Sequence, residues 1–176
     1  MPYSKEKIKL ILPSLEMKNR AMDFRSEFIE RGEKIHGSCG MHHYGDFTQW
    51  LNIVRQTAVN PPEGHPHSTT YFGIRVTDNS IVGVINIRHY LREEWYHNGH
   101  IGYSVRPSER NRGYASEMLR QALIKAEQAG IMETVVTCNR DNRASRKVIE
   151  NNGLSFEREF LEDNGNTVLI YHTDII

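Results

Sequence analysis

The most constraining feature of this chain is a short, basic, glycine-containing run at residues 110–115, with the sequence Arg-Asn-Arg-Gly-Tyr-Ala. It follows residues 99–105, whose apolar side chains alternate as they do in a β-strand. It precedes residues 115–126, where apolar residues recur with the period of an α-helix. Because the start of a helix carries unpaired N–H groups and a partial positive charge, a loop in this position favours a phosphate group.

The side chains of this loop also favour an anion, and two better-known phosphate loops do not fit it. Gly113 lets a ligand approach the backbone closely, and Arg106, Arg110 and Arg112 are expected to attract negative charge. No pair of glycines is followed by Lys-Ser or Lys-Thr as in a P-loop, and no Gly-x-Gly-x-x-Gly run occurs. The sequence therefore predicts a pyrophosphate-binding turn of another kind.

The pattern that fits is Arg/Gln-x-x-Gly-x-Gly/Ala, which Arg110, Gly113 and Ala115 satisfy. It resembles the coenzyme A loop of the GNAT superfamily of N-acetyltransferases. Residues 142–154 resemble the second signature of that superfamily, Asn-x-x-Ser/Ala followed by a helix and Gly-Phe. The resemblance extends over essentially the whole chain and is strongest over residues 69–154. Three segments resemble a group of bacterial GNAT proteins of unassigned substrate: residues 69–72, 86–89 and 99–103.

The order of expected elements agrees with that resemblance. Strands are expected at residues 8–12, 69–76, 81–90, 99–105, 134–138, 156–161 and 167–171. Two helices follow the first strand, one closed by Gly32 and one capped by Asp46; a third starts at Ala115 and a fourth after Asn142. The fold class is therefore α/β (α+β), and the length favours a single domain over residues 1–176. The resemblance implies the GNAT acyl-CoA N-acyltransferase fold: a mixed, mostly antiparallel central sheet, splayed between its fourth and fifth strands and flanked by helices.

Composition narrows the partners and the compartment. Because 22 basic residues balance 22 acidic ones, no attraction to nucleic acid is expected. No apolar run is long enough to span a membrane, and the first residues lack the core of a signal peptide. With only two cysteines, a reduced cytoplasmic protein is expected. The terminal hairpin offers an edge for a possible homodimer.

The resemblance implies that acetyl-CoA, as co-substrate, lies where the fourth and fifth strands separate. The backbone near Ser104 and Val105 would pair with the pantetheine arm, and the N–H groups of the loop would hold the pyrophosphate. Asn142 would contact the pantetheine or acetyl end; by its position it is also a helix cap, with Ser145 completing the local hydrogen bonds. The residues expected to bind the cofactor are Ser104, Val105, Arg110, Asn111, Arg112, Gly113, Tyr114, Ala115, Ser116, Asn142 and Ser145.

The implied reaction is attack of a primary amine, from a small molecule or a peptide, on the thioester in a ternary complex. Such an amine must lose a proton, so a general base is useful. His100 is the first candidate, although many relatives carry a glutamate at about this position. A half-buried histidine that bonds to the backbone is the other interpretation. Glu93 and Glu94 are further candidates that also suit a solvated surface.

The residue that returns a proton to the leaving thiolate is less evident. Superfamily members often use a tyrosine seven positions after the signature asparagine, and Ile149 stands there. Tyr171 or Tyr103 are possible replacements, although tyrosines in strands also serve in packing. A thiolate near its own pKa also leaves without a dedicated acid. The missing tyrosine keeps an alternative open, in which the fold senses acetyl-CoA or assists a partner without turnover.

The nine histidines do not indicate a metal site. Cys39, His42 and His43 form one cluster, and His65 and His67 form another. Neither cluster has a ligand spacing typical of zinc sites. Residues 37–45 are instead expected to shape the acceptor site, because the segment between the first two helices usually forms its wall in GNAT folds. Trp95 and Tyr96 are expected on the opposite wall.

Overall fold

In the computed structural model, residues 6–174 are described. A single sheet with the strand order β1-β2-β3-β4-β5-β7-β6 runs through the molecule. Its strands are β1 (Ile8–Ile11), β2 (Ser68–Arg75), β3 (Ile81–Arg88), β4 (Ile101–Val105), β5 (Val135–Asn139), β6 (Ser155–Leu161) and β7 (Thr167–His172). The helices are α1 (Lys18–Glu30), α2 (Phe47–Val59), α3 (Tyr114–Gln128) and α4 (Arg143–Asn151). Two of the short 3₁₀ turns are η3 (Glu93–Asn98), between β3 and β4, and η4 (Pro107–Glu109), between β4 and α3.

The predicted fold class is confirmed. Neighbouring strands are antiparallel except β4 and β5, which are parallel, so the sheet is mixed and mostly antiparallel. Strand boundaries differ from the expected ones by one or two residues. The fourth strand starts at Ile101 because Gly99 adopts a left-handed φ of 67°, which an extended strand does not allow.

The expected splay between β4 and β5 is present. The two strands pair only at Ile101 and Val136, after which β5 pairs along its length with β7. The edge of β4 that faces β5 therefore carries backbone groups, near Ser104 and Val105, that no strand of residues 6–174 pairs. The Val105 oxygen accepts a hydrogen bond from the Arg110 Nε at 3.3 Å, and the other groups on this edge need solvent or an extended ligand as a partner.

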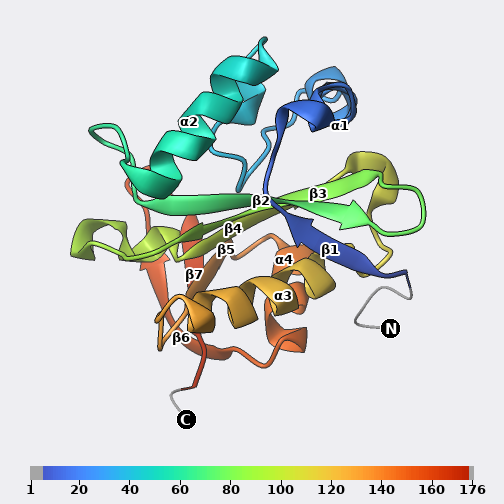
Figure 1. Cartoon of the computed structure of the whole chain (residues 1–176). Helices are drawn as coiled ribbons and strands as arrows, with labels where there is room; N and C mark the ends of the chain where they lie inside the picture. The colour runs from blue at the N-terminus through green and yellow to red at the C-terminus, as the bar shows by residue number, and fades with distance from the viewer. Residues whose placement is uncertain (1–5, 175–176) are drawn as a thin grey trace.

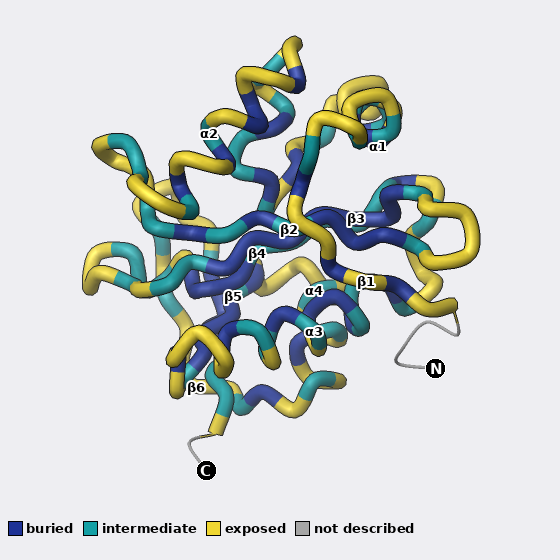
Figure 2. Tube along the Cα trace, in the orientation of Figure 1, coloured by how far each residue is buried: buried dark blue, intermediate teal, exposed yellow. Residues whose placement is uncertain are grey.

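Helices cover both faces of the sheet, with α1 and α2 on one face and α3 and α4 on the other (Figure 1). The side chains of β3 show the division, because Val84 packs with α1 and α2 whereas Ile85 and Ile87 pack with α3. The two cores enclose the central strands, which are the most deeply buried part of the chain (Figure 2). Within residues 6–174, no helix combines the length and hydropathy needed to cross a membrane.

Candidate functional site

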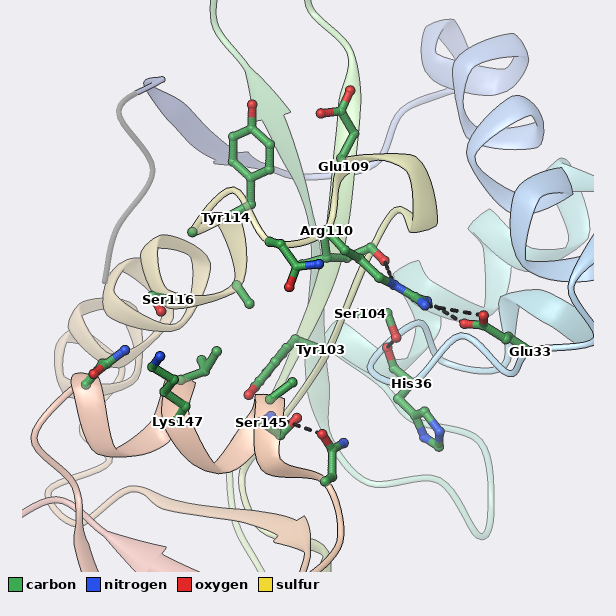
Figure 3. Close-up of a pocket in the computed structure, with 18 of the residues that line it drawn as sticks. Glu33, His36, Tyr103, Ser104, Glu109, Arg110, Tyr114, Ser116, Ser145 and Lys147 are labelled. Atoms are coloured by element: carbon green, nitrogen blue, oxygen red, sulfur yellow. Dashed lines mark hydrogen bonds and ion pairs between the residues drawn. The ribbon is translucent and has the colours of Figure 1, made fainter. Parts of the chain in front are cut away.

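A cavity of about 740 Å³ lies where the starts of α3 and α4 meet β4 and the segment after α1 (Figure 3). It is lined by Phe28, Glu33, Lys34, His36, Tyr103, Ser104, Val105, Glu109, Arg110, Asn111, Gly113, Tyr114, Ala115, Ser116, Asn142, Ala144, Ser145, Lys147, Val148 and Asn151. The structure thus brings together all the residues expected to bind the cofactor except Arg112, although the loop and the signature asparagine are far apart in sequence.

The loop enters α3 through two left-handed residues, Asn111 with φ 63° and Gly113 with φ 80°. Glycine adopts this conformation without strain, and asparagine tolerates it better than most residues. No side chain caps the start of α3, so the N–H groups of its first turn at Tyr114, Ala115 and Ser116 are left for another acceptor. Because the helix start is also electropositive, this geometry suits a phosphate group.

The arginines of the loop are not free to attract an anion. Each forms an ion pair: Arg106 with Asp23 and Glu27 at 2.6 Å, Arg112 with Glu109 at 2.7 Å, and Arg110 with Glu33. Their charge is therefore compensated inside the protein. The cavity is also lined by Lys34 and Lys147, which have no ion-pair partner among residues 6–174. The positive groups of the cavity that are not compensated within residues 6–174 are thus the backbone N–H groups at the start of α3 and these two lysines.

Tyr103 provides a direct sign that the cavity is built for a ligand. Its hydroxyl is the one buried side-chain oxygen or nitrogen in residues 6–174 that has no hydrogen-bond partner. Burial raises the pKa of Tyr103 to about 12, so this hydroxyl is protonated and able to donate. The side chain extends from β4 toward Ser145 (Figure 3). Leaving such a donor unsatisfied costs about 1–3 kcal/mol, and either the neighbouring Ser145 hydroxyl or an acceptor atom of a ligand would compensate it.

Asn142 and Ser145 form the cap that their spacing predicts. The Asn142 side-chain oxygen accepts a hydrogen bond from the Ser145 backbone N–H at 3.0 Å, at the start of α4. Both residues also line the cavity. The structural role of Asn142 is therefore present, and its position leaves room for the second role, contact with a cofactor.

His100 lies outside the cavity lining. Its side chain is buried, with 8% of its surface exposed, and its Nδ1 accepts a hydrogen bond from the Val135 backbone N–H at 2.9 Å. Burial, and secondarily the charge of Arg88, lower the pKa of His100 to about 4. The imidazole is therefore neutral at pH 7, with its proton on Nε2. The structure gives it the backbone-bonding role that was the other interpretation.

The other candidate proton donors and acceptors are also outside the lining, except Tyr103. Tyr171 is buried on β7, where its hydroxyl donates to Glu150 at 3.3 Å and burial raises its pKa. Glu93 and Glu94 are exposed on η3. Ile149 is fully buried in the core on the α3 side of the sheet.

His36, which no pattern in the sequence predicted as a site residue, lines the cavity on the side opposite Lys147 (Figure 3). The Ser104 hydroxyl donates a hydrogen bond to the His36 carbonyl at 2.9 Å. The next residue, Gly37, has φ 70° and packs so tightly that a Cβ there would lie 2.0 Å from the Gly102 oxygen. These two contacts hold the segment against β4. The glycine was visible in the sequence, but the strand that it contacts was not.

The segments expected to form the walls of the acceptor site lie outside the lining of this cavity. None of residues 37–45 lines it, and neither Trp95 nor Tyr96 does. Tyr96 instead donates a hydrogen bond to Glu157 at 2.8 Å, and Trp95 packs under the guanidinium of Arg92. No group of three or more His, Cys, Asp or Glu side chains within residues 6–174 is arranged to hold a metal ion.

Comparison with known proteins agrees with this geometry. The family profile "Acetyltransferase (GNAT) domain" matches residues 48–155, which is more than half of the chain. No curated protein matches the sequence. Among solved structures, RimL, a ribosomal alpha-N-protein acetyltransferase in complex with coenzyme A, has 17% identity and a TM-score of 0.71, over 99% of this chain and 97% of that one.

Two further structures show the same fold. RimJ of Mycobacterium smegmatis, in complex with CoA-disulfide, has 18% identity and a TM-score of 0.71, over 94% of this chain and 81% of that one. The microcin self immunity acetyltransferase MccE, in complex with acetyl-CoA and AMP, has 16% identity and a TM-score of 0.69, over 98% and 93%. With the matched domain and the uncapped helix start beside a splayed β4, the protein belongs to the GNAT family of acetyltransferases.

Proposed function

We propose that the protein transfers the acetyl group of acetyl-CoA to a primary amine of a small molecule or peptide, by direct attack in a ternary complex. In this reaction a nitrogen–carbon bond forms, the carbon–sulfur bond breaks, and a proton is exchanged from nitrogen to sulfur overall. The observation that carries the proposal is the cavity itself. It joins an uncapped helix start, an unpaired strand edge and an unsatisfied tyrosine hydroxyl along one path.

The donor half of the site follows from these groups. The N–H groups of Asn111 to Ser116 hold the pyrophosphate, and the open edge of β4 at Ser104 and Val105 pairs with the pantetheine arm. Lys147 lies on α4 near Ser116, where its charge reaches a phosphate (Figure 3). The complexes of RimL with coenzyme A and of MccE with acetyl-CoA support this donor.

We assign the proton acceptor to His36 in place of His100. A lysine-like amine costs about 4–5 kcal/mol to deprotonate at pH 7, whereas an α-amine costs about 1 kcal/mol, so a base assists the first more. The His36 imidazole is exposed beside the cavity and takes the proton directly or through one water. His36→Gln is expected to lower the turnover of a lysine-like amine more than that of an α-amine. His43→Gln, which changes an exposed histidine outside the cavity, is the control and is expected to leave the turnover of both amines unchanged.

Tyr103 serves the leaving group in the same scheme. With its pKa near 12, the hydroxyl does not give up its proton, but it donates a hydrogen bond to the sulfur as negative charge develops there. The thiolate then takes its proton from solvent. Tyr103 thus takes the role of the tyrosine that is absent at position 149. It also replaces Tyr171 as the candidate, because the Tyr171 hydroxyl donates to Glu150.

The decisive experiment combines binding and turnover. Calorimetric titration with acetyl-CoA is expected to show binding that Gly113→Glu abolishes, because the new carboxylate repels phosphate at the helix start. Release of free thiol is then followed with polyamines, amino acids, aminoglycosides and N-terminal peptides. Tight binding with no release above background for any amine favours the alternative, an acetyl-CoA sensor, which the buried Ile149 leaves open. The cytoplasmic location and the homodimer stay predictions.

A further inference from the structure

Arg88 is a half-buried cation without an anion. It stands at the end of β3, and its Nη1 donates hydrogen bonds to the backbone oxygens of Gly99 at 2.8 Å and Asn98 at 3.2 Å. No Asp or Glu among residues 6–174 forms an ion pair with it. Its other nitrogens, Nε and Nη2, have no hydrogen-bond acceptor in that part of the chain and are not fully buried.

The ionisable neighbours of Arg88 do not supply the missing negative charge. Cys39 lies close enough to interact with it, but burial raises the pKa of that thiol, so the thiol is neutral at pH 7. His100 is neutral as well, since burial lowers its pKa to about 4. Burial also lowers the pKa of Arg88, yet a guanidinium stays charged. A desolvated, unpaired charge is costly, which makes this position a candidate for binding an anionic ligand.

Arg88 is remote from the phosphate loop. The Arg88 backbone N–H donates to the His100 oxygen at 2.7 Å, so Arg88 lies beside the residue that precedes β4. The phosphate loop follows Val105, at the opposite end of β4. The rise of a strand separates these two levels by about 15 Å. A cofactor whose phosphates lie at the start of α3 therefore presents its reactive end, not its phosphates, toward the level of Arg88.

The segment after α1 connects the cavity with Arg88 along one face of the sheet. The His36 carbonyl is bonded to Ser104, Gly37 contacts Gly102, and Cys39 lies near enough to Arg88 for an electrostatic interaction. This is the face of Val84, covered by α1 and α2. On this face Gly37 covers Gly102, whereas the neighbouring Thr137 on β5 is half-buried.

Burial along the seam differs between the two faces of the sheet. Gly102 and Thr137 are half-buried, whereas Ile101 and Val136, whose side chains point to the opposite face, are buried. The partly exposed position at Thr137 is therefore where an acceptor would reach both the seam and the guanidinium.

We propose that Arg88 binds a carboxylate of the acceptor, so that the acceptor is an amino-acid-like molecule carrying both an amine and a carboxylate. The inference rests on the proposed acetyl transfer, because it places the acceptor beside the reactive end of the cofactor. A guanidinium matches a carboxylate through two parallel hydrogen bonds, and the Nε and Nη2 groups of Arg88 form such a pair. The carbonyls of Asn98 and Gly99 fix the orientation of the guanidinium from the other side.

The experiment uses bisubstrate analogues and does not require turnover. Coenzyme A is joined through an S-acetyl amide to glycine, β-alanine or 4-aminobutyrate, and in matched compounds to methylamine, ethylamine or propylamine. Calorimetry is expected to show that at least one carboxylate compound binds the wild-type protein about tenfold or more tightly than its matched amine compound. If no carboxylate compound has an advantage while coenzyme A itself binds, the inference is overturned and the donor site stands. If coenzyme A does not bind, the proposed function fails first.

Variants connect the advantage to the residue. Arg88→Gln is expected to remove the preference for the carboxylate, and Arg88→Lys, which keeps the charge but loses the fork, to retain only part of it. Arg55→Gln removes the same charge from an exposed position on α2 and is expected to change nothing. Thermal melting checks that each variant is folded. A preference that persists in folded Arg88→Gln contradicts the proposal, and if that variant does not fold, Arg88→Lys gives the same test.

Discussion

Replacement of Gly37 by alanine tests whether the segment after α1 is fixed to β4 by a backbone contact. The added Cβ would lie 2.0 Å from the oxygen of Gly102, 2.3 Å from its carbonyl carbon and 2.6 Å from the nitrogen of Tyr103. All three atoms belong to the backbone of a strand, so no flexible side chain can move aside. The φ of 70° adds strain that only glycine avoids.

Gly32 is a matched control for this change. It has φ 65°, and an added Cβ meets nothing within 4 Å, so Gly32→Ala measures the left-handed strain alone, about 1–2 kcal/mol of unfolding free energy. Gly37→Ala adds overpacking of about 1–3 kcal/mol, which gives about 2–5 kcal/mol in total. Denaturant unfolding of both variants at pH 7 measures the difference. If the two losses agree within about 0.5 kcal/mol, the segment yields freely and its proposed fixation of His36 is refuted.

Three further changes test separate parts of the site. Tyr103→Phe removes a buried, unsatisfied hydroxyl, so it is expected to raise the unfolding free energy of the unliganded protein by about 1 kcal/mol and to weaken acetyl-CoA binding. A lower unfolding free energy together with weaker acetyl-CoA binding would contradict the assignment. Lys147→Ala is expected to weaken coenzyme A binding severalfold at low salt and less at high salt, and Lys147→Arg to restore it. The pKa of His100 in the folded protein, near 4, lies below the ordinary value of about 6.5. Its contribution to the unfolding free energy is therefore fully present above pH 6.5 and falls by at most about 3 kcal/mol toward pH 4, because the unfolded chain binds the proton first. His100→Gln should show a shallower loss in unfolding experiments at pH 7 and 4.5, and an unchanged slope would exclude this cause.

The sheet and its helices could be predicted because their patterns are local. Alternation along residues 81–88 and the helical period after Ala115 do not depend on the rest of the chain, and the cap of Asp46 on Thr48 involves residues two positions apart. The donor loop was predictable for the same reason. Its function depends on backbone N–H groups at a strand-to-helix junction, and glycine marks that junction in the sequence.

The states of the candidate histidines could not be predicted, since they depend on partners far away in sequence. His100 is a polar residue on a strand, and nothing local reveals that Val135, on the next strand, donates to its ring. His36 gains its position from Ser104, which is 68 residues later. A pattern of alternation gives the face on which a side chain lies, but not how deeply that face is covered.

The same long-range effect changes the meaning of the arginines, which looked like an anion-attracting cluster in the sequence. All their partners beyond the loop lie on α1 or just after it, and Glu27 also accepts hydrogen bonds from the backbone and hydroxyl of Ser108. Because the Arg106 and Glu27 side chains are mostly buried, with 16% and 23% exposed, this pairing is stronger than a surface salt bridge. The arginines therefore attach the phosphate loop to α1, while the segment after α1 is attached to β4 through His36 and Gly37. Donor loop, α1 and β4 thus form a closed set of contacts, which reaches both ends of the cavity.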